Sequence, residues 1–107
     1  MNEGHGDPLI QLKLWTAAGK KTALATVIAT WGSSPRPVGS HMAVREGGNF
    51  SGSVSGGCIE GAVVEAAREV IKTSKSKLLE YGVSNEAAWE VGLACGGRIQ
   101  VFVEPVI

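Results

Sequence analysis

The chain has 107 residues, and its ten lysine and arginine residues balance ten aspartate and glutamate residues. This length fits one compact domain, and the balanced charge argues against a nucleic-acid-binding protein, which usually carries a basic stripe. With 44% apolar and 19% charged residues, the composition argues against intrinsic disorder, and no uncharged stretch reaches the roughly 20 residues of a membrane span.

The first third of the sequence predicts a tail, a helix and a long strand. Residues 1–6 are expected to form a flexible tail. Asp7 and Pro8 are typical of a helix start, as N-cap and first helical residue, and Gly19 is typical of a helix end. Thr22–Trp31 is rich in β-branched residues and alanine, which predicts a largely buried strand.

Two glycine-rich loops surround a predicted hairpin. Gly32–Gly39 contains two prolines and cannot form regular structure. His41–Arg45 predicts a short strand, Glu46–Asn49 a turn, and the chain from Phe50 onward the second strand of the hairpin. Gly52–Gly57 is the second glycine loop.

Helical periodicity begins at Ile59. Apolar residues recur there at three- and four-residue spacing, which predicts an amphipathic helix, at Ile59, Ala62, Val63, Ala66, Ala67, Val70 and Ile71. Lys77–Tyr81 then predicts a strand, residues 84–88 a helical turn, Gly92–Gly97 a third glycine turn, and Arg98–Glu104 a last strand.

These elements predict an α+β fold for a single domain over residues 1–107. We expect a small mixed sheet of about four to five strands, two main helices packed on one face, and glycine-rich loops at the strand ends. Eight of the 15 glycines lie between Gly32 and Gly61, so we expect the function there.

The glycine loop before the second helix is the first candidate site. Ser55, Gly56 and Gly57 lead into Cys58 and Glu60, and such a loop offers backbone N–H groups and the positive end of a helix dipole to an anion. A cysteine in that place is expected to have a lowered pKa. The spacing matches neither a Walker loop nor GxGxxG. Alternatively, the glycines only permit a tight turn, Cys58 is a small buried apolar residue, and Glu60 complements the helix dipole.

The second cysteine lies in Cys95-Gly96-Gly97, which on its own reads as a structural turn. Cys58 and Cys95 together would allow a redox pair, a persulfide relay or part of a metal site. Zinc needs about four ligands at regular spacing, and since only two histidines are present, we expect no metal site. Two cysteines are too few for a disulfide framework, and no secretory signal is visible, so we expect a reduced, cytoplasmic protein.

The Gly32–Gly39 loop is the third candidate. Ser33 and Ser34 offer hydroxyl groups, and Arg36 lies between two prolines on a stiffened loop that ends at Gly39. A guanidinium held in this way suits a phosphate or a carboxylate. A rigid surface turn with a solvated arginine is the alternative.

Three segments together resemble one known family. They are Ala25–Gly39 (ATVIATWGSSPRPVG), Gly52–Gly61 (GSVSGGCIEG), and Gly92–Gly97 (GLACGG) followed by Val103–Pro105. In this order and spacing they resemble the N-terminal domain of the xanthine dehydrogenase accessory (XdhC/CoxI) family. Longer members carry a C-terminal Rossmann-like domain, for which this sequence has no GxGxxG, so it resembles the N-terminal module alone.

The resemblance implies a maturation factor that transiently binds the molybdenum cofactor (molybdopterin), assists its sulfuration with a cysteine desulfurase, and inserts it into a molybdenum hydroxylase apo-enzyme. Xanthine dehydrogenase and carbon monoxide dehydrogenase are such hydroxylases. A homo-oligomer, specifically a dimer, and a separate Rossmann-domain chain are expected as further partners. The implied cofactor-binding residues are Ser33, Ser34, Arg36, Gly39, Ser55, Gly56, Gly57, Cys58, Glu60, Cys95, Gly96 and Gly97.

Two other functions remain open. One is a sulfurtransferase that uses Cys58 as its nucleophile. The other is an interaction module whose glycine loops form a partner surface. No nucleic acid or membrane is expected as a partner.

Overall fold

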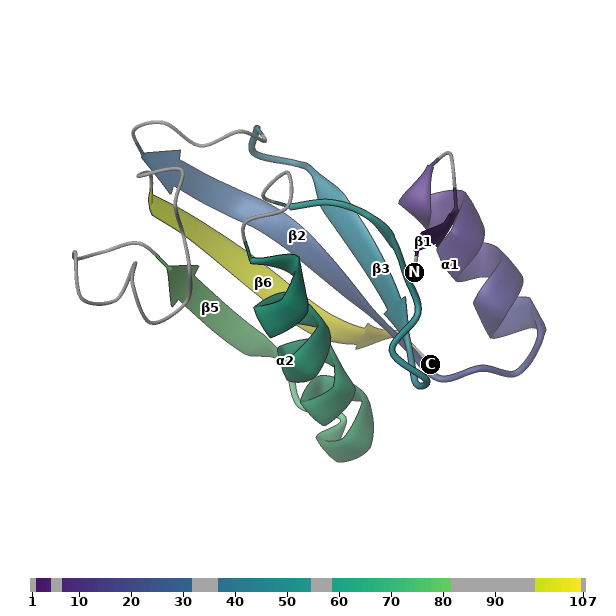
Figure 1. The fold of residues 1–107 in the computed structure, drawn as a ribbon. Coiled ribbons are helices and arrows are strands. Elements are labelled where there is room, and N and C mark those ends of the chain that lie inside the picture. The colour runs from purple at the N-terminus through teal and green to yellow at the C-terminus, as the bar shows by residue number, and fades with distance from the viewer. Residues whose placement is uncertain (1, 5–6, 32–36, 55–58, 82–97, 107) are drawn as a thin grey trace.

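The computed structural model of the chain describes residues 2–4, 7–31, 37–54, 59–81 and 98–106. Within these ranges, the elements follow one another in the order β1-α1-β2-β3-β4-α2-β5-β6 (Figure 1). In the part of the chain that the structure describes, neither helix is long and apolar enough to cross a bilayer. The bounds are β1 Asn2–Gly4, α1 Pro8–Ala17, β2 Thr22–Trp31, β3 His41–Arg45, β4 Phe50–Gly52, α2 Glu60–Thr73, β5 Lys77–Tyr81 and β6 Arg98–Val106.

Most of the predicted elements are confirmed. β2, β3 and β5 have the predicted bounds, α1 has Asp7 as its N-cap, and the second helix has Ile59 as its N-cap. The last strand runs beyond Glu104 to Val106. The predicted helical turn at residues 84–88 lies outside the described residues.

The strands form one sheet with the order β1-β4-β3-β2-β6-β5. β2 to β6 are antiparallel to their neighbours within this order, whereas β1 pairs with β4 in parallel. The predicted α+β fold with a small mixed sheet is confirmed. The expected tail is wrong for Asn2–Gly4, because these residues form β1 on the otherwise unpaired edge of β4, where free backbone groups favour strand addition.

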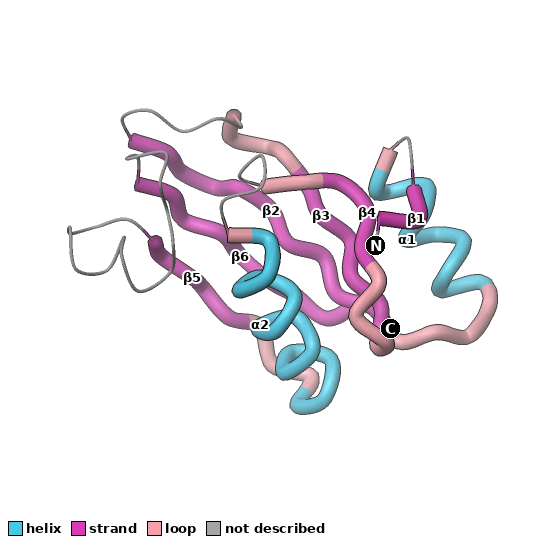
Figure 2. Tube along the Cα trace, viewed as in Figure 1, coloured by secondary structure: helices cyan, strands magenta, loops and turns pink. Residues whose placement is uncertain are grey.

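One face of the sheet is covered by α2 (Figure 2). The apolar stripe of α2 buries Val63, Ala67 and Val70 against inward-facing residues of the central strands. The strand residues on this face alternate along the chain, as the pleat requires, and comprise Ala23, Ala25, Val27, Met42, Val44, Ile99, Val101 and Val103.

The other face of the sheet carries α1. Leu12 and Trp15 of α1 pack against Ala43 of β3, whereas the neighbouring Met42 and Val44 belong to the core beneath α2. All three of these β3 residues are fully buried, so β3 is covered on both sides. The expectation that both helices pack on one face is therefore wrong: a strand that is apolar at consecutive positions needs a cover on each face.

The cap of α1 gives a first test. The Asp7 carboxylate accepts a hydrogen bond from the Leu9 backbone N–H at 2.9 Å, so Asp7→Ala leaves that donor without its cap. We expect Asp7→Ala to lower the free energy of unfolding by about 1 kcal/mol, and we expect Asp7→Ser to keep most of the wild-type stability. Urea unfolding of the three proteins measures the difference, and identical midpoints would exclude a stabilising cap.

Candidate functional site

The three glycine-rich segments are attached at the same end of the sheet (Figure 1). The first connects the end of β2 to the start of β3, the second connects β4 to α2, and the third connects β5 to β6. Trp31 pairs with Arg98, and Tyr81 pairs with Ile99. The end of β2, the end of β5 and the start of β6 therefore lie side by side.

The structure describes two of the predicted site residues, Gly39 and Glu60. The remaining ones fall in residues 32–36, 55–58 and 82–97, outside the described part of the chain. Their convergence on one surface stays a prediction. They are Ser33, Ser34, Arg36, Ser55, Gly56, Gly57, Cys58, Cys95, Gly96 and Gly97.

Gly39 closes the first loop against β2. Its N–H donates to the Val27 carbonyl oxygen at 2.8 Å, and the Val27 N–H donates to the Ser40 carbonyl oxygen at 2.9 Å. Gly39 has a φ of 95°, a conformation that favours glycine. The β2–β6 register shifts between Val27 and Ala29, so the loop is joined to β2 beside an irregularity in the strand.

Glu60 closes the second loop. One carboxylate oxygen, Oε2, accepts hydrogen bonds from the Ser53 hydroxyl at 2.5 Å and from the Val54 N–H at 3.0 Å. Val54 and Ile59, which flank residues 55–58, are buried in the core beneath α2. Residues 55–58, which include Cys58, are thus flanked in the sequence by two buried residues. The Glu60 carboxylate links the first of these, Val54, to the start of the helix.

The N-terminus of α2 lies where the sequence predicts it. Ile59 is the N-cap, and its apolar side chain makes no capping hydrogen bond. Aligned peptide dipoles make this end of the 14-residue helix favourable to anions, and the Glu60 carboxylate in the first turn is one such anion. Cys58 directly precedes the N-cap in the sequence, but its own placement lies outside the described residues.

His41 has a structural partner on the neighbouring strand β2. Its Nδ1 is 3.0 Å from the Thr26 hydroxyl oxygen, and its backbone oxygen accepts a hydrogen bond from the Ser53 N–H at 3.2 Å. Sequence reasoning missed these roles of Thr26 and Ser53. No local signal indicates the Ser53–Glu60 contact, because a capping box joins a serine and an acid three residues apart, whereas these two residues are seven apart.

Polar contacts also join β5 to β6, beside the third segment. Arg98 and Gln100 each donate a hydrogen bond to the Glu80 carboxylate at 2.7 Å. The hydrogen bond from Arg98, followed by that from Gln100, holds the pKa of Glu80 below its ordinary value. Burial raises the pKa of Tyr81, which packs against the core, so its hydroxyl stays protonated at neutral pH.

No group of three or more histidine, cysteine, aspartate or glutamate residues is placed to hold a metal ion within the described ranges. Both cysteines lie outside those ranges. The described residues instead contribute the loop closures at Gly39 and Glu60, beside the N-terminus of α2.

This α+β fold is that of a known family. The model of the XdhC and CoxI family matches residues 15–82, which is more than half of the chain. The chain therefore belongs to the XdhC and CoxI family.

Two bacterial relatives are longer than this chain. The molybdenum cofactor insertion chaperone PaoD of Escherichia coli is 37% identical over 82 residues, which cover 77% of this chain and 26% of PaoD. A probable xanthine dehydrogenase subunit of Bacillus subtilis is 30% identical, covering 81% of this chain and 27% of that protein. The chain thus spans about a quarter of these two relatives.

A solved structure shares the fold. The crystal structure of a xanthine dehydrogenase from Bacillus halodurans matches with a TM-score of 0.77 and 30% identity. The match covers 95% of this chain and 31% of that one.

Proposed function

We propose that the protein is a maturation factor that transiently binds the molybdenum cofactor and inserts it into a molybdenum hydroxylase, such as xanthine dehydrogenase or carbon monoxide dehydrogenase. The observation that carries the proposal is the attachment of the three glycine-rich segments at one end of the sheet, beside the α2 N-terminus (Figure 1). The similarity to a molybdenum cofactor insertion chaperone over 77% of the chain supports the choice of cargo.

The chemistry of the cargo fits this end of the fold. Molybdopterin carries a terminal phosphate, and the positive end of a helix whose N-cap side chain is apolar favours such an anion. In the proposal, Ser33, Ser34 and Arg36 bind the polar and charged groups of the cofactor. Cys58 and Cys95 provide soft thiols near the metal-bearing end. Gly39 and Glu60 close the loops that carry these groups.

The finer steps form part of the same proposal. The protein receives sulfur with the help of a cysteine desulfurase, hands the sulfurated cofactor to the apo-enzyme in the cytoplasm, and acts as a chaperone without turnover of its own. A separate Rossmann-domain chain serves as a further partner.

Glu60 offers a test that separates positioning of the loop from direct contact with the cargo. Glu60→Ala removes the acceptor for two donors, one of which belongs to the fully buried Val54. The amide oxygen of Glu60→Gln still accepts both bonds. We expect Glu60→Ala to weaken binding of the isolated molybdenum cofactor roughly tenfold and Glu60→Gln to restore most of the affinity.

Glu65→Ala on the same helix is the matched control, because Glu65 is exposed and pairs with the exposed Arg68 at 3.4 Å. Its affinity should equal that of the wild type. Equal affinities for Glu60→Ala and Glu65→Ala would remove Glu60 from the site. Circular dichroism of each variant confirms that the helix content is retained.

The alternative of a Cys58-dependent sulfurtransferase predicts a different result. Cys58 would then be alkylated with a pH midpoint well below the roughly 8.5 of a free cysteine, and would accept sulfur in the absence of cofactor. An interaction module would bind no cofactor at all. Mass measurement after incubation with the cofactor distinguishes these functions.

A further inference from the structure

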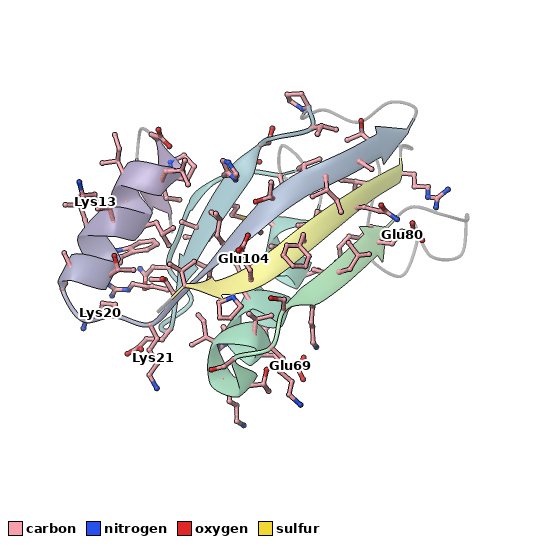
Figure 3. All side chains as sticks on the ribbon, turned by 180° about the vertical axis from the view of Figure 1, so that it is seen from behind. Lys13, Lys20, Lys21, Glu69, Glu80 and Glu104 are labelled. Carbon is pink, nitrogen blue, oxygen red and sulfur yellow. The ribbon has the colours of Figure 1, made fainter. Side chains whose placement is uncertain are left out.

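A polar cluster lies where β5 ends and β6 begins, on the side of the sheet away from α2. Ile99 and Val101 of β6 are buried beneath α2, so the intervening Gln100 faces the opposite side, as does Glu80, its partner on β5. Figure 3 looks onto this side and shows Glu80 at the end of β5. We call Glu80, Arg98 and Gln100 the Glu80 cluster.

The Glu80 cluster lies beside the points where two of the glycine-rich segments leave the sheet. Tyr81 directly follows Glu80 and ends β5 before the third segment, and Arg98 is the first residue of β6 after it. Arg98 also pairs with Trp31, which ends β2 before the first segment. A ligand bound by these two segments would therefore lie next to the cluster.

The cluster leaves two hydrogen-bond acceptors unused. Arg98 and Gln100 both donate to the same carboxylate oxygen of Glu80, Oε2, at 2.7 Å. Among the described residues, no donor is bonded to Oε1 of Glu80 or to the amide oxygen of Gln100. The hydrogen bond from Arg98 lowers the pKa of Glu80, so the carboxylate is ionised at neutral pH and only accepts. Because the Glu80 side chain is 34% exposed, a ligand that carries donors can reach it.

Apolar side chains continue this side of the sheet next to the cluster. Leu78 of β5 pairs with Phe102 of β6, two residues along each strand from Glu80 and Gln100. Leu78 is 57% exposed, and in Figure 3 α1 lies over β3, to one side of these strands. Two acceptors bordered by an exposed apolar surface suit a flat heteroaromatic ring that carries donors along one edge, since apolar contacts hold the ring and the polar groups orient it.

We propose that the Glu80 cluster binds the pterin end of the molybdenum cofactor, with Oε1 of Glu80 and the amide oxygen of Gln100 as acceptors for the exocyclic amino group and the adjacent ring N–H. This inference rests on the function proposed above. The two donors lie side by side on one edge of the pterin ring, and an ionised carboxylate is a strong acceptor for them. The same carboxylate repels a phosphate, so the pterin ring is the part of the cofactor that fits this cluster.

Binding of free pterin and of lumazine tests the inference, because lumazine has an oxygen in place of the exocyclic amino group. Both compounds fluoresce, so titration with the purified chain measures each affinity. The wild type is expected to bind pterin roughly tenfold more tightly than lumazine, and Glu80→Gln is expected to lose most of this preference. Gln100→Met keeps the Glu80–Arg98 pair and should weaken pterin binding roughly threefold or more.

Glu69→Gln is the matched control, because Glu69 also pairs with a cation, Lys77 of β5, but lies on α2 on the other side of the sheet. This variant should keep the wild-type preference, and thermal unfolding confirms that each variant is folded. A wild type that binds both compounds equally, or neither, would overturn the inference, as would an unchanged preference in Glu80→Gln. Retention of the molybdenum cofactor without a preference for pterin would overturn this inference alone. A preference for pterin without retention of the cofactor would instead overturn the proposed function and leave the ring site standing.

Discussion

Replacing Gly52 by alanine is expected to lower the free energy of unfolding by about 3 kcal/mol or more. Gly52 ends β4 with a φ of 88°, where an L side chain is strained. A Cβ atom there would lie 2.4 Å from the His41 carbonyl oxygen and 2.9 Å from Cγ of Pro8. The first contact is with backbone and the second with the start of α1, so neither can move away without disturbing the β3–β4 pairing or the docking of the helix.

Gly19→Ala separates backbone strain from steric overlap. Gly19 has a similar φ of 82°, but a Cβ there would meet nothing within 4 Å. This variant should lose only about 1 kcal/mol, the cost of the backbone conformation. Urea unfolding measures both losses, and equal losses would mean that neither the His41 carbonyl oxygen nor Pro8 approaches Gly52 closely enough to exclude a Cβ atom.

Cys58→Ala is expected to abolish retention of the molybdenum cofactor, whereas Cys95→Ala should weaken it less. Cys58 directly precedes the N-cap of a 14-residue helix, whose dipole stabilises a thiolate or a persulfide. The sequence around Cys95 predicts a turn without a long helix behind it. Pterin fluorescence of the two purified variants after incubation with cofactor measures retention.

Both cysteine variants should remain folded, because each change removes one sulfur atom at a cost of about 1–2 kcal/mol. Thermal unfolding checks this condition before retention is compared. Retention by Cys58→Ala equal to that of the wild type would exclude the thiol from the mechanism and favour an interaction module. A larger loss for Cys95→Ala would reverse the assigned roles.

The local elements could be predicted because each carries its own signal. Asp7-Pro8 determines the start of α1, and the three- and four-residue apolar spacing after Ile59 determines α2. The placement of α1 could not be predicted, since it depends on Ala43, whose small side chain gives no signal of being covered by a second helix. β6 continues past Glu104 through Pro105 because it still pairs there with β2, whereas its pairing with β5 ends at Val103. Proline is tolerated at this position because the strand has no partner on one side.

The candidate site could be predicted as a set of loops, but its internal contacts could not. The glycine-rich segments and the helix start at Ile59 follow directly from the sequence. The contact between Glu60 and Ser53 depends on how the chain leaves β4, and the one between Thr26 and His41 depends on the β2–β3 register. Both contacts depend on how the sheet places the segments that carry these residues.

Transfer of the molybdenum cofactor to an apo-enzyme is the decisive test of the proposed function. The purified chain is incubated with isolated cofactor, separated from the unbound fraction, and mixed with an apo molybdenum hydroxylase, while bound molybdenum, bound pterin and recovered hydroxylase activity are measured. Molybdenum and pterin are expected to elute together with the chain, and the loaded chain is expected to activate the apo-enzyme, with both effects reduced in Glu60→Ala but not in Glu65→Ala. A folded chain that elutes without molybdenum and pterin, and leaves the apo-enzyme inactive, would rule out the proposed function.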